Sequence, residues 1–414
     1  MLSNLQIELI QSTVPVLREQ SVAITQAMYR RMFTDNPEVA RMFNPSHMHP
    51  GGQTGALAGA IVAYAEHLRD LDALKDALAV IVHKHVALQV QPEQYAIVGG
   101  HLLAAITEVL DDAATPELMA AWAEAYGFLA GVCIDAEKAI YTAQTEVPKG
   151  WSGLREFVVT KKRMETPNIA SLWVRPSDGG ELPTFAPGQH VSVALPGADD
   201  LALRQYSLAQ APGGDRWRLT IKAEPACQVS KPGVVSNRIV RTLEQGTTLL
   251  LSMPSGSFVF DPHAGEHPIA LLAGGVGITP IFSMVASSVA AKPERPVLLI
   301  HAAIDKRSRP LDGELRELAA AHSSVDLVCV HERPAADERI GHDYHRKGRV
   351  DQHALRELLP STSSERATLE VWTCGPHGFM ASVDAALEAL GIASERRHFE
   401  FFGPARALRG CPIG

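Results

Sequence analysis

The sequence predicts a multidomain protein: an all-helical region, then an antiparallel β-barrel, then an α/β region with a parallel sheet. Three observations predict this order. The chain has 414 residues, too many for a single compact core. Its apolar periodicity changes from helical to alternating near residue 150, and strands alternate with helices after residue 262. The first 150 residues are also acidic, with 9 Lys and Arg against 17 Asp and Glu, whereas the remainder is balanced. We therefore expect domains at residues 1–147, 151–261 and 262–414.

Composition excludes several classes of protein. The net charge is -8 and no basic tract occurs, so nucleic acid is not an expected partner. The five cysteines include no Cys-x-x-Cys pair, which argues against zinc and iron–sulfur sites and fits a reducing compartment. No signal peptide is recognisable, and residues 268–291, although uncharged, contain central glycines and Pro280. We expect a cytoplasmic monomer without a stable membrane anchor.

Helical periodicity dominates residues 1–150. Pairs that begin helices occur at Asn36-Pro37, Gln91-Pro92 and Thr115-Pro116, and the first of them predicts a helix over Val39–Phe43. Apolar residues recur at helical spacing from Leu57 to Leu68 and from Leu74 to Leu88. Six or seven helices are expected.

Polar residues interrupt these apolar patterns, and one of them suits a metal. His85 lies within the apolar stretch Ile81–Leu88, where a neutral imidazole could ligate haem iron. Four others share its setting: Tyr29, Gln53, Tyr95 and Glu137. Each alone is more often a surface residue or a hydrogen-bonded core residue, since an unsatisfied buried polar group costs about 1–3 kcal/mol. The spacing of all five residues along the sequence, taken together, is therefore more informative than any one of them.

Residues 1–147 resemble the globin domain of bacterial flavohaemoglobins. The matching motifs are Met28–Phe33, Phe43, Gln53, Lys84-His85 and Gln94–Ala104. The resemblance implies that His85 ligates the iron of haem b, that Tyr95 and Glu137 hydrogen-bond it, and that Tyr29 and Gln53 face dioxygen. It also implies that Leu57 closes the pocket and Phe43 packs on the haem. Two departures are Gly100 and Ala139, where the family usually has Glu.

Alternating patterns follow a short linker. The expected strands are Leu154–Lys161, Ile169–Arg175, His190–Leu195, Trp217–Lys222 and Thr247–Leu251, which suggest a closed antiparallel barrel. A further stretch, Arg204-Gln205-Tyr206-Ser207-Leu208, has residue types that suit a flavin, because Arg can bind pyrophosphate and Tyr can stack on the ring. Alternation places Arg204 and Tyr206 on one face of this strand and Ser207 on the other. Read alone, the stretch is more often an ordinary barrel strand.

Arg-x-Tyr-Ser-Leu resembles the flavin signature of the ferredoxin–NADP reductase superfamily, which implies FAD. That family has Tyr where this chain has His190, after Gly188-Gln189. Gly233 and Ser236 match a later segment at which a helix N-terminus can hold phosphate.

The last region begins with a buried apolar run and a glycine loop, Gly274-Gly275-Val276-Gly277-Ile278-Thr279-Pro280. Strand, glycine loop and helix together can cradle a pyrophosphate. The loop resembles the nicotinamide site of the same reductases, as does Cys374-Gly375-Pro376. The tail resembles their flavin-covering segment, with Phe401, Phe402, Gly403 and Pro404. By this resemblance Glu400 and Lys84 lie between flavin and haem.

The resemblance implies a nitric oxide dioxygenase that converts nitric oxide and dioxygen to nitrate with electrons from NADH or NADPH. The sequence does not decide between the two nucleotides. Two alternatives remain open: a haem and flavin reductase of hydroperoxides, and a module that senses dioxygen or nitric oxide or carries lipid. A sensor would not need both Arg204–Leu208 and Gly274–Pro280.

Overall fold

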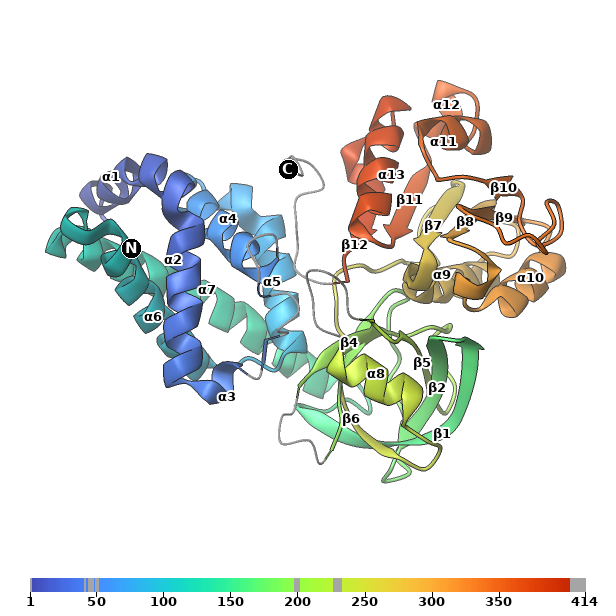
Figure 1. The fold of residues 1–414 in the computed structure, drawn as a ribbon, viewed down its shortest axis with the longest axis horizontal. Coiled ribbons are helices and arrows are strands. Elements are labelled where there is room, and N and C mark those ends of the chain that lie inside the picture. Colours follow the sequence, from blue (N-terminus) through green and yellow to red (C-terminus); the bar gives the residue numbers. More distant parts are fainter. Residues whose placement is uncertain are drawn as a thin grey trace.

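A computed structural model describes residues 2–40, 42–43, 48, 52–196, 202–225 and 233–402. Its three regions follow the chain, with helices first, then a barrel of strands, then a sheet flanked by helices (Figure 1). The predicted fold class is confirmed.

Seven α-helices form the described part of the first region. They are α1 (Asn4–Ser12), α2 (Val14–Asp35), α3 (Pro37–Ala40), α4 (Gln53–Glu66), α5 (Lys75–Ala87), α6 (Pro92–Leu110) and α7 (Pro116–Glu146), with single 3-10 turns at Leu71–Leu74 and Asp111–Ala113. The helix predicted over Val39–Phe43 is wrong at its end, since α3 stops at Ala40 and Phe43 is not helical.

Helix α7 is the longest helix in the described residues and holds this region together. Thr115 caps its start by accepting a hydrogen bond from the amide of Leu118 at 3.3 Å. By length and composition alone α7 could cross a membrane, but core helices pass the same test. It contacts α1, α5 and α6 and buries Trp122 and Glu137. Its apolar composition is therefore explained by the packing of the helical core.

The second region is a six-stranded antiparallel barrel with one helix. Its strands are β1 (Leu154–Thr166), β2 (Ile169–Pro176), β3 (His190–Ala194), β4 (Arg204–Ser207), β5 (Trp217–Lys222) and β6 (Thr248–Ser252), and its helix is α8 (Val234–Arg241). The strand order is β4-β3-β6-β1-β2-β5, and a bridge between Leu208 and Leu219 joins the two ends. Closure removes the exposed sheet edges.

The third region is a parallel sheet in the order β10-β9-β8-β7-β11-β12. Its strands are β7 (Ile269–Gly274), β8 (Val297–Ala303), β9 (Val325–His331), β10 (Arg346–Lys347), β11 (Glu370–Cys374) and β12 (Arg397–Glu400). Its helices are α9 (Ile278–Ala291), α10 (Asp312–Ala321), α11 (Gln352–Leu358), α12 (Ser363–Arg366) and α13 (His377–Ala389). Two apolar clusters, one with α9 and α10 and one with α11 and α13, cover the two faces of the sheet (Figure 1). The uncharged stretch 268–291 is β7, a glycine loop and α9, as the sequence predicted.

An ionic cluster of two arginines and two glutamates joins the barrel to the parallel-sheet region. Arg218 on β5 is 3% exposed and contacts Glu165 on β1 at 3.1 Å and Glu314 on α10 at 2.5 Å. Arg163 on β1 also pairs with both carboxylates. The side chains of Arg218 and Glu165 are only 4% and 8% exposed, whereas those of Arg163 and Glu314 are 40% and 30% exposed. One buried ion pair and its two partly exposed partners thus balance one another and fix how the two regions meet.

Candidate functional site

Three helices bring the predicted iron ligand and its partners together. His85 on α5 places Nδ1 2.8 Å from the hydroxyl of Tyr95 on α6 and 2.8 Å from Oε1 of Glu137 on α7. The Tyr95 hydroxyl donates to the same carboxylate oxygen at 2.5 Å. A carboxylate only accepts, so Nδ1 carries the proton and Nε2 keeps its lone pair free for a metal. Burial, and then the bond to Glu137, raise the pKa of Tyr95, which keeps the phenol protonated.

The ligand set is consistent with a porphyrin-bound iron rather than a metal held by protein alone. In the part of the chain that the structure describes, no group of three or more His, Cys, Asp or Glu side chains could hold a metal. A haem needs only one axial protein ligand. His85 with its anchored Nδ1 meets that need.

Two further tyrosines, not anticipated from the sequence, support this arrangement. Tyr126 donates to the carbonyl of Tyr95 at 2.7 Å, and Tyr141 donates to the carbonyl of Val90 at 3.0 Å. Gly99 allows the Tyr126 ring to approach, since a Cβ there would lie 2.3 Å from it. Both tyrosines lie on α7 with Glu137, so the available sequence signal is their position on the same apolar helix.

The residues predicted for the opposite side of the pocket also gather. Tyr29 on α2 is 5% exposed and hydrogen-bonds Gln53 at the start of α4. The Tyr29 and Phe43 rings meet edge to face at 5.4 Å, and Leu57 on α4 packs on the same apolar cluster. Burial raises the pKa of Tyr29 to about 12, although the bond to Gln53 lowers it. Tyr29 therefore offers a protonated hydroxyl at neutral pH.

The strand pair β3 and β4 carries the predicted flavin residues. Arg204 and Tyr206 lie opposite Val193 and Val191, whereas Ser207 lies opposite His190, so the predicted alternation is confirmed. Tyr206 packs against the barrel core and Gln205 is exposed. Burial lowers the pKa of Arg204, whose Nη1 donates to the carbonyl of Leu203 at 2.8 Å. A half-buried guanidinium at this position can bind an anionic pyrophosphate.

His190, the departure from the family pattern, lies at the start of β3. Its ring packs on Gly256, where a Cβ would approach it to 2.9 Å, and its Nε2 atom is buried without a partner among the described residues. Burial is the main cause that lowers the pKa of His190 to about 4, with further contributions from His83 and Lys84. The imidazole is therefore neutral. Gly188, two residues earlier, adopts φ +100, which favours glycine.

Gly233 and Ser236 lie at the start of α8. The Ser236 hydroxyl accepts a hydrogen bond from the amide of Glu224 at 3.3 Å and lies beside Gly233. In this structure the hydroxyl therefore stabilises the start of the helix. Residues 226–232, which precede it, lie outside the described residues. A phosphate role for this pair stays a prediction.

The glycine loop and the end of β11 form one closely packed unit. A Cβ on Gly277 would lie 2.2 Å from the carbonyl oxygen of Cys374, and one on Gly274 would lie 2.9 Å from Pro376. Gly275 adopts φ +55, and its carbonyl contacts Nε2 of His301 at 3.0 Å. The side chain of Thr279 donates to the carbonyl of Val276 at 3.0 Å. Only glycines allow these backbones to approach, so the loop packs directly on the end of β11. The loop leads into α9, and a helix N-terminus after a glycine loop can hold a phosphate.

Strand pairing brings the remaining predicted residues to the same sheet edge. Cys374 lies beside Ala273 of β7 and Glu400 of β12. Burial raises the pKa of Cys374, so it is a protonated thiol. The 3-10 turn at Gly275–Gly277 also contacts β5, which places the glycine loop beside the barrel.

Glu400 on β12 and Lys84 on α5 lie close enough for the charge of each to act on the pKa of the other. Burial raises the pKa of Glu400 to about 7, and Lys84 partly opposes this. Burial likewise lowers the pKa of Lys84, opposed by Glu400. Phe401 follows, with its ring 6.2 Å from His377, and Phe402 is half-exposed. Gly403 and Pro404 lie outside the described residues.

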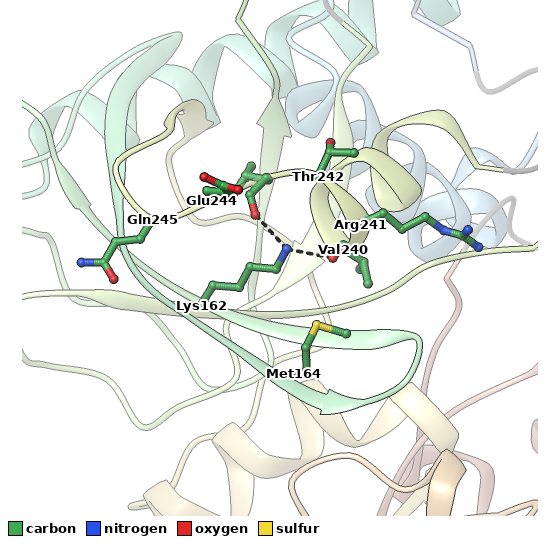
Figure 2. A pocket seen from close by; sticks show the side chains of 8 residues that line it. Lys162, Met164, Val240, Arg241, Thr242, Glu244 and Gln245 are labelled. Carbon is green, nitrogen blue, oxygen red and sulfur yellow. Dashed lines mark hydrogen bonds between the residues drawn. The ribbon is translucent and has the colours of Figure 1, made fainter.

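A separate pocket on the barrel has none of the predicted residues. Lys162 occupies it, and its ammonium donates to the carbonyls of Val240 at 2.8 Å and Leu243 at 2.7 Å (Figure 2). A third bond reaches Ile239 at 3.2 Å, so all three donors are used to close the end of α8. We infer that the side chains that line this pocket stabilise the barrel.

Comparison with known proteins agrees with this geometry. A family model described as Globin matches residues 26–133, and one described as Oxidoreductase NAD-binding domain matches residues 271–385. The Flavohemoprotein of Chromobacterium violaceum is 42% identical over 407 residues, covering 97% of this chain and 98% of that protein. The Flavohemoprotein of Bacillus subtilis is 39% identical over 410 residues, covering 99% of each.

Two solved structures extend the comparison. A flavohaemoglobin from Malassezia yamatoensis with bound FAD and haem has a TM-score of 0.81 and 29% identity, covering 97% of this chain and 100% of that one. The FAD/NAD-binding domain of a nitric oxide dioxygenase from Vibrio cholerae has a TM-score of 0.53 and 29% identity, covering 60% of this chain and 99% of that one. Because relatives about 40% identical span nearly its whole length, the chain belongs to the flavohaemoprotein family.

Proposed function

We propose that the protein is a nitric oxide dioxygenase that holds haem b and FAD and takes electrons from NADH or NADPH. One observation carries the proposal: a His85 held by Glu137, with Tyr29 buried beside Gln53, shares a chain with a strand and a glycine loop suited to a flavin and a nucleotide. When bound, NAD(P)H, FAD and haem supply hydride, its division into single electrons, and oxygen chemistry at iron, respectively. Each NAD(P)H thus converts two nitric oxide and two dioxygen molecules to two nitrates, with release of one proton.

The chain's own residues divide the work. His85 would bind the iron, and Glu137 holds its Nδ1 proton at 2.8 Å, which increases electron donation from Nε2. Tyr29 keeps its proton and would donate a hydrogen bond to a ligand on the open side of the pocket. Arg204 would bind pyrophosphate, and Tyr206 would stack on the flavin ring. The loop Gly274–Pro280 would bind the nucleotide phosphates at the start of α9.

We propose that residues 1–147 hold the haem, residues 151–261 the FAD and residues 262–414 the nucleotide, in a cytoplasmic monomer. Hydroperoxide reduction would use the same donors, so it is the second candidate to be tested.

The test combines a spectrum with an assay. Adding NADH to the anaerobic protein should reduce both flavin and haem, and the reduced protein given dioxygen should consume nitric oxide and release nitrate. An Arg204→Ala variant should lose FAD and this turnover, because it loses the pyrophosphate contact. A haem that stays ferric, or turnover on cumene hydroperoxide that exceeds turnover on nitric oxide, would contradict the proposal.

A further inference from the structure

The helix that carries His85 is tied to the barrel by one buried hydrogen bond. Ser192 on β3 is 0% exposed, and its hydroxyl donates to the carbonyl of Ala87. Ala87 is the last residue of α5, two residues after His85. The last four carbonyls of a helix have no partner within it, so the Ser192 hydroxyl satisfies an acceptor that would otherwise be buried and unpaired.

Ser192 is itself held rigidly by the barrel. Its amide donates to the hydroxyl of Ser252 on β6 at 2.9 Å, and that hydroxyl donates to the carbonyl of Met253 at 2.9 Å. In the strand pair, Ser192 lies directly opposite Gln205 of the flavin stretch. A chain of hydrogen bonds therefore runs from the barrel wall through Ser192 to the end of α5.

The electrostatics of His190 agree with the placement of α5 beside β3. His190 lies two residues before Ser192, so the two side chains share one face of the strand. The charges that act on His190 come from His83 and Lys84 of α5. The end of α5 at Ala87 thus lies against β3 at Ser192.

We propose that Ser192 is a positioning residue for electron transfer: its hydroxyl fixes the end of α5 against β3 and so sets the separation of the haem and flavin sites. The inference rests on the proposed function, because it assumes that electrons cross this contact. The chain passes from the helical region to the barrel through residues 147–153, which lie between α7 and β1. A short connection limits the distance between the regions without fixing their orientation, which leaves that task to contacts such as Ser192 with Ala87.

The experiment separates the loss of the Ser192 hydroxyl from a change in the shape of the side chain. Ser192→Thr keeps the hydroxyl and Ser192→Val has the shape of Thr without it, while Ser192→Ala removes it without adding volume. Thr160→Val is the matched control, because Thr160 makes a similar bond to the carbonyl of Trp173 at 3.0 Å inside the barrel. Haem reduction and flavin reduction by NADH are followed separately in anaerobic stopped flow on the holoprotein. Cleavage after Lys149, in the connecting segment, by a lysine-specific protease reports docking without any turnover.

In Ser192→Ala and Ser192→Val, haem reduction should slow about tenfold and cleavage after Lys149 should accelerate. Flavin reduction should stay unchanged in every variant, and Ser192→Thr and Thr160→Val should match the unaltered protein. Unchanged haem reduction in Ser192→Ala and Ser192→Val would overturn the inference, as would a Ser192→Thr variant as slow as Ser192→Val. If the unaltered protein shows no haem reduction by NADH, the proposed function fails instead, and the cleavage rates still report on the contact.

Discussion

The Nδ1 atom of His85 lies 2.8 Å from Oε1 of Glu137, a carboxylate that is only 3% exposed. A buried carboxylate that accepts a hydrogen bond from Nδ1–H draws the proton away from the imidazole ring. The Nε2 atom therefore becomes a stronger electron donor. The pair therefore acts on whatever metal Nε2 binds, although Glu137 never touches that metal.

Replacing Glu137 with Gln should raise the reduction potential of the iron. Gln keeps the size of Glu but removes the negative charge that favours the oxidised metal. Partners of this kind typically change metal affinity 10–100-fold. A loss of that size in the affinity for oxidised iron relative to reduced iron corresponds to roughly 60–120 mV for one electron. A spectroelectrochemical titration of the holoprotein measures the shift. Tyr141→Phe is the control, because Tyr141 bonds only the carbonyl of Val90 in the described residues, and an equal shift in both variants would contradict the assignment.

Replacing Tyr29 with Phe should slow nitric oxide oxidation about 10²–10³-fold, the usual cost of losing a hydrogen-bond donor where charge develops. Burial raises the pKa of Tyr29 to about 12, so the donor is present throughout the physiological range and the effect should not depend on pH between 6 and 9. Tyr64→Phe is the matched control. Burial also raises the pKa of Tyr64 to about 12, but its hydroxyl bonds the carbonyl of Ala125 at 2.7 Å inside the core. Equal losses in the two variants would place Tyr29 in a structural role.

Local chemistry explains which features could be predicted from the sequence. The strand, glycine loop and helix at residues 269–291 follow from apolar runs, glycines and Pro280, all within one short segment. The same holds for the cap of α7 at Thr115 and for the alternation that separates Ser207 from Tyr206. Such features depend on periodicity and backbone geometry, which neighbouring residues determine.

Contacts between distant segments could not be predicted in this way. Ser192 and Ala87 are 105 residues apart, and Arg218 and Glu314 are 96 apart. A serine in a strand and an arginine in a strand carry no local sign of their partners, because the fold alone brings these pairs together. The Tyr95–Glu137 pair, 42 residues apart, was anticipated only through family resemblance.

Replacing Gly277 with Ala should weaken nucleotide binding about tenfold or more while leaving haem and flavin content intact. An added Cβ would lie 2.2 Å from the carbonyl oxygen of Cys374, so the loop or the end of β11 must move. Titration with NAD⁺ and the rate of flavin reduction by NADH measure the loss. Gly313→Ala is the control, since Gly313 lies in α10 with open space around it and Ala there should stabilise the helix by about 0.5–1 kcal/mol. Normal nucleotide binding in Gly277→Ala would show that the loop tolerates displacement.

Glu400 should make the protein less stable as pH rises through neutrality. Burial raises the pKa of Glu400 from 4.5 to about 7, so the folded protein holds a proton that the unfolded chain releases. The resulting stabilisation is complete below about pH 4.5 and is lost as pH rises through about 7. Glu400→Gln keeps an uncharged side chain at every pH. Relative to this variant, the free energy of unfolding of the unaltered protein should fall by about 1–3 kcal/mol between pH 5 and 8, measured by denaturant unfolding of the holoprotein.

Glu395→Gln is the control, because Glu395 is exposed and its pKa is lowered, chiefly by hydrogen bonds to its own backbone and to Ser394. Parallel pH profiles for the unaltered protein and Glu400→Gln would mean that Lys84 compensates the buried carboxylate fully.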